Sequence, residues 1–375
     1  MPSWFANQIA GVMLRLGANN PRWREHLGHY LPVMKGVFPH DNTAKLLVFR
    51  ILDAVEDRQL ARAQRLLEQM RLIVNRENGT NAEKTLYLVL AGMYHLRRED
   101  VYEAARHMRW AGKYGHDFHM PRLILGLHYV YDRWLFERAY AELDKGIDCL
   151  YAYGTLDEEK RRVIAVMHSL MALCRTMMHQ PEEAERLLTL AAPASGTPEY
   201  QHALATLRAV QGRRMEAETA MAALKKLDPA RHDHWQEGIG MMLEGTHPHF
   251  TARKPDQEAI AAYWEWFAKN EKELRRMLNL QGPRTCHAMQ REAFQPLVPE
   301  PDNIDMMGHD FVMVDGKPEM HFYALHSRNY QALIDALAEA CPREVTSRWK
   351  LRAFPGSPWG TARETIAHYA EEGER

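Results

Sequence analysis

Residues 91–104 read AGMYHLRREDVYEA, and the same pattern returns in residues 126–139 as GLHYVYDRWLFERA. Three positions recur 35 residues later with residues of the same kind: Ala91, Tyr94 and Ala104 become Gly126, Tyr129 and Ala139. A fixed period near 34 residues predicts stacked helix hairpins. Small residues let the two helices of a hairpin cross closely, and the aromatic residue fills the gap to the next hairpin.

The alternation of helix, short polar break and helix extends over residues 42–230 and predicts five hairpins. The first pairs residues 44–56 with residues 59–74, and in the second of these helices the apolar residues form one stripe. The step from Ala139 to Ala184 is 45 residues, longer than the others. Thr155-x-x-Glu158 has the form of a capping box, which predicts a long helix from there to about residue 178.

These positions resemble the tetratricopeptide-repeat family, whose motif has a small residue, an aromatic residue three places later and an alanine early in the second helix. The fourth and fifth hairpins supply the alanines, and Pro181 begins a second helix. The pattern departs from the family at the aromatic place, which holds Ala54, Arg175 and Arg208 in three of the hairpins. The resemblance implies an α-α superhelical stack, a mainly α fold, whose usual role is to bind another protein.

The rest of the chain differs from the stack. Asp315-Gly316 separates two β-type runs, residues 310–314 and 320–325, and is a strong hairpin signal. A helix and a third β-type run follow, which predicts a small α/β domain resembling those appended to helical-repeat proteins of unknown function in bacteria. The predicted organisation is: N-terminal helices in 1–41, repeats in 42–230, connecting helices in 231–280, the small α/β domain in 281–355 and a tail in 356–375.

Composition argues against several classes of protein. Lys and Arg number 48 and Asp and Glu 49, for a net charge of -1, so the chain has no general attraction for phosphate backbones. We expect no nucleic acid partner. The first 20 residues lack a basic region before their apolar ones, and no window holds about 18 consecutive apolar residues, so we expect neither export nor membrane insertion but a cytoplasmic protein. Its four cysteines are far apart and are expected to be reduced.

The sequence gives little sign of chemistry. The closest histidine groupings, such as His247 with His249 and His321 with His326, lack the spacing of zinc ligands. Phosphate-loop, dinucleotide-binding and α/β-hydrolase motifs are not found. Cys286 and His287 are adjacent, so their side chains point apart and the histidine cannot activate the thiol. We therefore expect no catalytic residue, no bound metal and no cofactor.

The favoured function is a non-enzymatic scaffold or adaptor that binds a protein or peptide segment along the inner face of the stack. The alternative is an enzyme with its site in the α/β domain or at its junction with the stack. The Lys and Asn residues that grip a chain's terminal carboxylate in many tetratricopeptide proteins are missing here, and most of their places hold apolar residues. The predicted partner-binding residues are Leu88, Leu123, Leu127, Tyr131 and Leu173. Such an apolar face is either covered by the chain's own segments or open to an apolar partner.

Overall fold

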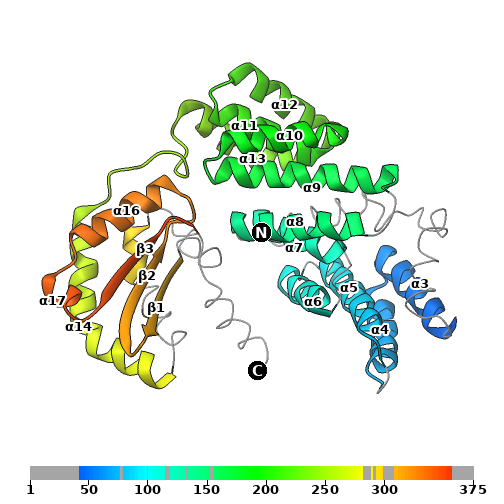
Figure 1. The fold of residues 1–375 in the computed structure, drawn as a ribbon, viewed down its shortest axis with the longest axis horizontal. Helices are drawn as coiled ribbons and strands as arrows, with labels where there is room; N and C mark the ends of the chain where they lie inside the picture. The colour runs from blue at the N-terminus through cyan, green and yellow to red at the C-terminus, as the bar shows by residue number, and fades with distance from the viewer. Residues whose placement is uncertain are drawn as a thin grey trace.

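A computed structural model describes residues 42–356, apart from the short segments 77–78, 99, 115–118, 132–133, 153–155, 282–288, 290–292 and 299–307. The expected N-terminal helices, almost all of the expected tail, and the Cys286-His287 pair lie outside the described residues. The chain forms a stack of helix hairpins, drawn from blue to green in Figure 1, followed by a small α/β domain in yellow to red.

Five consecutive hairpins form the stack, as the repeat period predicted. In each, the two helices pack on each other, and the second helix also packs on the first helix of the next hairpin. A further helix, α13 (Pro229–Glu244), packs on the fifth hairpin. The hairpins are α3 (Asn42–Glu56) with α4 (Leu60–Val74), α5 (Asn81–Arg97) with α6 (Val101–Tyr114), α7 (His119–Tyr131) with α8 (Phe136–Ala152), α9 (Glu158–Met177) with α10 (Pro181–Leu190), and α11 (Pro198–Val210) with α12 (Arg214–Leu227).

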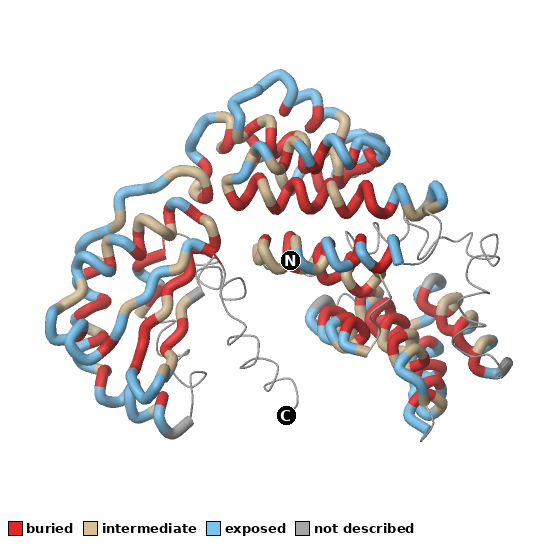
Figure 2. The backbone as a smooth tube through the Cα atoms, viewed as in Figure 1, coloured by how far each residue is buried: buried red, intermediate tan, exposed pale blue. Residues whose placement is uncertain are grey.

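Small residues allow the helices of each hairpin to approach closely. At Gly126 on α7, an added Cβ would lie 2.6 Å from the side chain of Leu143 on α8, well inside van der Waals contact. Ala91 and Ala139 are fully buried, and so are Ala184 and Ala217 in the later hairpins. The repeated small residues are therefore buried, and Figure 2 colours the buried parts of these helices red.

In three hairpins, the residue at the aromatic position of the repeat contacts the second helix of the preceding hairpin. The Tyr94 hydroxyl on α5 donates a hydrogen bond to Gln64 on α4 at 3.3 Å. Arg175 on α9 lies over the ring of Tyr140 on α8, 3.9 Å from its centroid. Arg208 on α11 likewise binds a carboxylate on α10. The arginines that depart from the aromatic pattern thus make the same connection by other chemistry.

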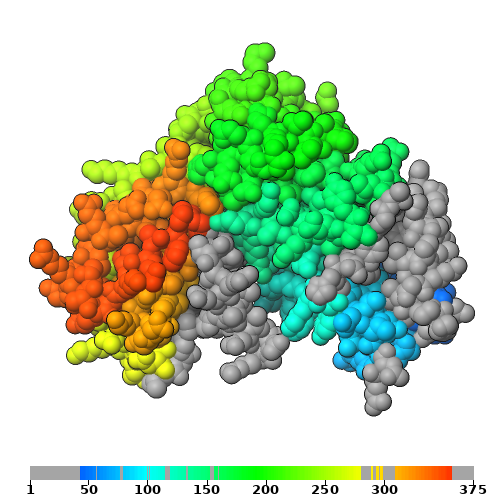
Figure 3. Space-filling view, in the orientation of Figure 1, coloured from blue at the N-terminus to red at the C-terminus, as the bar shows by residue number. Residues whose placement is uncertain are grey.

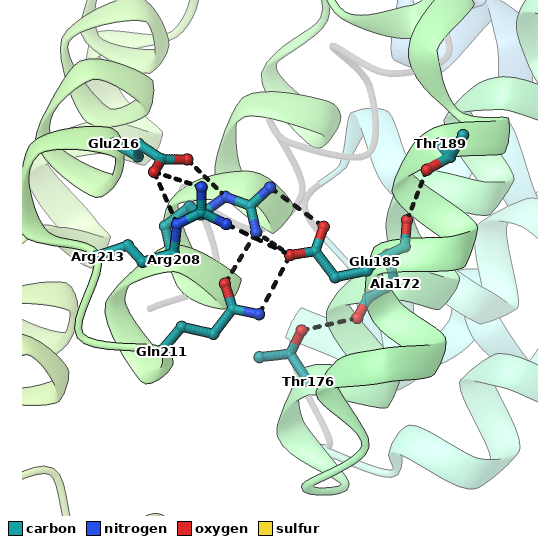
Figure 4. Close-up of polar contacts among 8 residues, drawn as sticks. All are labelled: Ala172, Thr176, Glu185, Thr189, Arg208, Gln211, Arg213 and Glu216. Carbon is teal, nitrogen blue, oxygen red and sulfur yellow. Dashed lines mark hydrogen bonds and ion pairs between the residues drawn. The ribbon is translucent and has the colours of Figure 1, made fainter.

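Arg208 is the centre of a polar network between the last two hairpins (Figure 4). Its guanidinium donates to Glu185 of α10 and lies 3.1 Å from a carboxylate oxygen of Glu216 on α12. The Gln211 amide donates to Glu185 at 3.1 Å, and Arg213 donates to Glu216 at 2.7 Å. Because the Arg208 side chain is mostly buried, this network orients three helices rather than merely solvating their surface.

Helix α9 begins two to three residues later than the sequence indicated. Its N-cap is Asp157, whose carboxylate accepts a hydrogen bond from the backbone N–H of Lys160 at 2.8 Å. The capping box predicted at Thr155 and Glu158 is wrong, since Glu158 is the first helical residue and Thr155 lies outside the described residues. An aspartate caps a helix as well as a threonine does, which is why the pattern was ambiguous. The helix ends at Met177, next to the predicted end.

The α/β domain has the predicted order of strand, strand, helix, strand, with a long helix before it and a second short helix before the last strand. Strands β1 and β2 pair antiparallel, and β2 and β3 pair parallel across an intervening helix. The second core includes Phe267, Phe311 and Trp349, whose rings contact one another. The elements are α14 (Gln257–Gln281), η2 (Gln295–Leu297), β1 (Gly308–Val314), β2 (Lys317–Tyr323), α16 (Arg328–Glu339), α17 (Arg343–Thr346) and β3 (Lys350–Phe354).

Residues 251–256 separate the part of the chain that forms the core of the stack from the part that forms the core of the α/β domain. Helix α13 contributes Ile239 and Met242 to the core of the stack, whereas α14 contributes Ile260 and Phe267 to the core of the α/β domain. The segment 231–280, expected as connecting helices, is thus divided between the two cores. Although α14 has 25 residues, no helix in the described part of the chain is long and apolar enough to cross a membrane.

Replacing Gly316 by valine is expected to destabilise the protein by about 1–2 kcal/mol. Asp315 and Gly316 form the two-residue turn between β1 and β2, with φ of 50° and 74°. An added Cβ at Gly316 would meet no atom within 4 Å, so the cost comes from the left-handed backbone alone. Urea unfolding measures it, with Gly316→Asn as the control because asparagine tolerates this conformation. Equal stability of the two variants would contradict the turn assignment.

Candidate functional site

The five side chains predicted to contact a partner do not form an open surface in the lone chain. Leu123, Leu127 and Leu173 are buried, with Leu127 only 1% exposed, and Tyr131 is 7% exposed. Leu88 is half-buried. Of the two arrangements that an apolar inner face allows, this burial corresponds to the covered one. Their role in binding a partner remains a prediction.

The chain's own later helices cover Tyr131 at the end of α7. Its ring stacks on His202 of α11 with centroids 5.8 Å apart, and its hydroxyl lies 3.3 Å from the Nδ1 atom of that histidine. Arg231 and Trp235, both on α13, contact the same ring. The stack therefore curves enough to bring the third hairpin against the fifth hairpin and the helix that follows it.

Three histidines from different loops meet where the stack joins the α/β domain. His179 follows α9, His249 lies in the segment after α13, and His326 follows β2. The rings of His179 and His249 stack, with centroids 5.4 Å apart and planes 13° from parallel. The Nε2 atom of His179 donates to the carbonyl of His326 at 2.6 Å, and Nε2 of His249 donates to that of Met177 at 2.6 Å. Both rings thus carry their proton on Nε2.

His326 fastens the α/β domain to α8. Its Nε2 atom lies 2.5 Å from a carboxylate oxygen of Glu137, and its backbone N–H donates to the carbonyl of Pro355 at 2.6 Å. Leu325 and His326 have φ of 49° and 62°, a left-handed pair that only a well-determined contact maintains. His326 does not lie on the same strand as His321, because β2 ends at Tyr323.

Backbone contacts complete the junction. The N–H groups of Arg328 and Asn329, at the start of α16, donate to the carbonyls of His249 and Pro248 at 3.0 and 3.3 Å. These are N–H groups that a helix cannot satisfy internally. Together with His179 and His326 they hold the α/β domain against the stack, and Figure 3 shows the two parts in contact along this side.

Burial lowers the pKa of three histidines at the junction, namely His179, His247 and His249. It lowers the pKa of His249 to about 3, although the hydrogen bond to Met177 opposes the change. Burial likewise lowers the pKa of His247, next in the same segment, to about 4, and lowers the pKa of His179. Neutral rings can stack at this distance without repulsion. The rings of His179, His247 and His249 are therefore uncharged in the folded protein at neutral pH.

Replacing His249 by glutamine is expected to weaken the loss of stability in mild acid. Below about pH 6.5 the unfolded chain protonates this histidine while the folded chain does not, until its folded pKa of about 3. Unfolding is thus favoured as the pH falls through this window, by about 1.4 kcal/mol per pH unit. The variant should lose about 2 kcal/mol less than the wild type between pH 6.5 and 5.

Urea unfolding at several pH values measures this difference. Ala252→Gln, on the exposed part of the same segment, is the matched control because it changes no titrating group. The control should follow the wild-type pH dependence. If His249→Gln also shows the wild-type pH dependence, then His249 is protonated as readily in the folded protein as in the unfolded chain. Its ring would then be charged at the junction in mild acid.

The second helices of the hairpins also carry exposed apolar side chains. Each of these helices has at least one large apolar side chain that is 44% to 80% exposed. These residues are not among the side chains that the sequence predicted to contact a partner. We call them the exposed apolar set: Leu72 on α4, Tyr102 on α6, Tyr151 on α8, Leu190 on α10, and Met215 and Leu227 on α12.

The remaining candidate catalytic side chains are buried or already paired with other residues of the chain. Cys149 and Cys174 are buried, and burial raises the pKa of the Cys174 thiol, so it is a poor nucleophile. In the α/β domain, the Glu319 carboxylate accepts from Arg352 at 2.6 Å and lies 2.9 Å from Nε2 of His321. In the described part of the chain, one set of three metal-type ligands meets across the second hairpin: His95, Glu103 and His107.

No histidine grouping considered from the sequence contains that set. Its detectable signal is Glu103-x-x-x-His107, a four-residue step that places both side chains on one face of α6. Nothing in the sequence indicated that His95 would join them. No protein-family model, no curated protein and no solved structure matches this chain, so its function has to be inferred from its own residues.

Proposed function

We propose that this chain is a non-enzymatic cytoplasmic scaffold of the tetratricopeptide-repeat type, which holds another protein against its helix stack. The observation that carries the proposal is the exposed apolar set, because it recurs on the second helix of every hairpin. Repeat stacks offer long continuous surfaces, and exposed apolar groups on such a surface favour contact with a protein.

The register of the hairpins supports the repeat type. The small residue and the bridging residue keep their separation of three in Ala91 with Tyr94 and in Gly126 with Tyr129. Ala172 with Arg175 and Ala205 with Arg208 continue it in the next two hairpins. Each small residue is buried, and three of the four bridging residues contact the second helix of the preceding hairpin.

The exposed apolar set is a better candidate for docking than the inner face. Leu123, Leu127, Tyr131 and Leu173 already pack inside the chain, so a partner would have to displace those contacts. The exposed set needs no such rearrangement. An apolar helix or extended segment of the partner, laid across α8, α10 and α12, would cover side chains that now face water.

An enzyme is less well supported. The buried carboxylate Glu319 is the strongest candidate acid or base in the α/β domain, but Arg352, His321 and Lys350 all lie within ion-pairing distance of it. Burial tends to raise the pKa of Glu319, and the hydrogen bonds from Arg352 and His321 outweigh this and lower it. A carboxylate held in this way stabilises the sheet and has little capacity left for a substrate.

Site-specific photo-crosslinking in extract from the producing organism tests the proposal. A photoreactive residue is placed at Tyr151, Leu190 or Leu227, and at Ala141 and Lys225 as exposed controls on two of the same helices. We expect one protein to be crosslinked from at least two of the three apolar positions and from neither control. Mass spectrometry identifies the adduct.

Substitution then separates contact from proximity. Leu190→Asp combined with Leu227→Asp should reduce binding of that protein about 10-fold or more, a loss of at least about 1.4 kcal/mol. Lys225→Asp is the control and should leave binding within about 2-fold. Circular dichroism checks that the variants fold. Binding that survives the double substitution would show that the exposed apolar set is not the docking surface.

A further inference from the structure

The second hairpin brings two imidazoles and a carboxylate together. His95 lies in the last turn of α5, while Glu103 and His107 lie in the first two turns of α6. One ligand atom from each residue lies within 4.8 Å of those from the other two. The histidine rings stack, with centroids 4.8 Å apart and planes 26° from parallel. Nitrogen and carboxylate ligands in this combination suit Zn²⁺ and related divalent transition metals.

An unsatisfied nitrogen points to a missing partner. The Nδ1 atom of His95 is buried and has no hydrogen-bond partner among the described residues. Its closest acidic neighbour, an oxygen of Asp100, is 3.6 Å away, too far for a good hydrogen bond. Buried polar atoms without partners are uncommon in folded proteins, and an ion is one of the standard reasons for them.

His107 is already oriented as a metal ligand. Its Nδ1–H donates to the backbone carbonyl of Glu103 at 2.8 Å, which leaves the lone pair on Nε2. Metal-binding histidines typically make this kind of hydrogen bond with their second nitrogen.

The carboxylates around the set have other partners that an ion would have to share. Both oxygens of Glu103 accept hydrogen bonds from the exposed Arg106 at 3.1 and 3.2 Å. Asp100 accepts a hydrogen bond from the backbone N–H of Glu103 at 3.1 Å and so caps α6. A surface arginine in the same helix is readily displaced, since such pairs contribute little stability.

We propose that His95, Glu103 and His107 form a binding site for Zn²⁺ or a similar divalent transition metal, with a fourth position open to water. Around a tetrahedral zinc ion with ligands at about 2.0–2.1 Å, the ligand atoms are roughly 3.4 Å apart. Side-chain rotations that move each ligand atom by about 1 Å would bring the three atoms from within 4.8 Å of one another to this separation. The ion would join the end of α5 to the start of α6 and stiffen the second hairpin.

Calorimetric titration of tag-free, chelator-treated full-length protein with ZnCl₂ tests the site. We expect one equivalent to bind more tightly than any further zinc, and His95→Gln combined with His107→Gln to weaken that binding about 100-fold or more, since even changes around a ligand cost 10- to 100-fold. Co²⁺ as a second probe should give the visible absorption bands of a tetrahedral nitrogen and oxygen site. His128→Gln, a half-buried histidine on α7, is the control and should keep full affinity.

Glu103→Gln is the second variant, because its half-exposed carboxylate can be changed without opening the core. It should weaken the binding of Zn²⁺ while circular dichroism shows an unchanged helix content. Equal zinc affinity of the wild type and of the double histidine variant would overturn the proposal. So would a wild-type protein that binds no zinc, or Co²⁺ spectra that show only octahedral coordination.

Discussion

Arg231→Ala is expected to lower the free energy of unfolding by about 3–5 kcal/mol, because it leaves a buried carboxylate without its counter-charge. Arg231 on α13 is fully buried, and its guanidinium lies 3.0 Å from a carboxylate oxygen of Glu199, which is itself only 1% exposed. It also lies 3.4 Å from Asp228 and contacts the ring of Tyr131. The substitution therefore disturbs α7, α11 and α13 together.

Urea unfolding followed by circular dichroism measures the loss. Arg214→Ala is the matched control, since Arg214 pairs with Glu218 at 3.6 Å on the exposed side of α12 and should cost less than about 1 kcal/mol. Replacing both partners, as Arg231→Met with Glu199→Leu, should cost less than Arg231→Ala because no charge remains buried. Similar losses for Arg231→Ala and Arg214→Ala would show that Arg231 is accessible to water in solution.

The repeat could be recognised from the sequence because its packing is local. Residues that cross within one hairpin, such as Gly126 and Leu143, are close in the chain, so the constraint on size appears as a period. The turn at Asp315-Gly316 was equally predictable, since its conformation depends on those two residues. Helix starts were less certain: Asp157 and Thr155 are both competent caps, and only the packed helix selects between them.

The arginines at the aromatic position show that the motif does not describe the contacts between hairpins. The motif records the common residue type, whereas the physical requirement is a contact with the preceding hairpin. Arg208 meets that requirement through Glu185, which lies 23 residues earlier and has no fixed place in the motif. Arg175 meets it through a ring on α8. At both places the departure from the family pattern keeps a contact between neighbouring hairpins.

The candidate sites were harder to predict because their parts are distant in sequence. An apolar inner face looks the same whether a partner or the chain itself covers it, and Tyr131 is covered by His202, 71 residues away. The contact between His179 and His326 spans 147 residues. The second hairpin's ligand set was missed for a different reason: Glu103 and His107 form a four-residue step, but their partner lies on another helix.

Ala139→Glu is expected to cost about 2–4 kcal/mol, from overpacking and from burying a carboxylate. Ala139 is 0% exposed on α8, and its hairpin is the one in which Gly126 is in close contact with Leu143. The substitution adds four heavy atoms at a position with no exposed surface, so α7 or α8 has to move to accommodate them. Thermal melting followed by circular dichroism measures the effect as a lower Tm.

Ala141→Glu supplies the control, two residues further along the same helix but exposed. Both substitutions add the same group to α8 and change its helix propensity and the net charge alike, so their difference isolates the packing at the hairpin crossing. Ala141→Glu should change stability by no more than about 0.5 kcal/mol. An Ala139→Glu variant that melts with the control would mean that α7 and α8 do not cross at Ala139, and the 35-residue register that defines the stack would have to be reassigned.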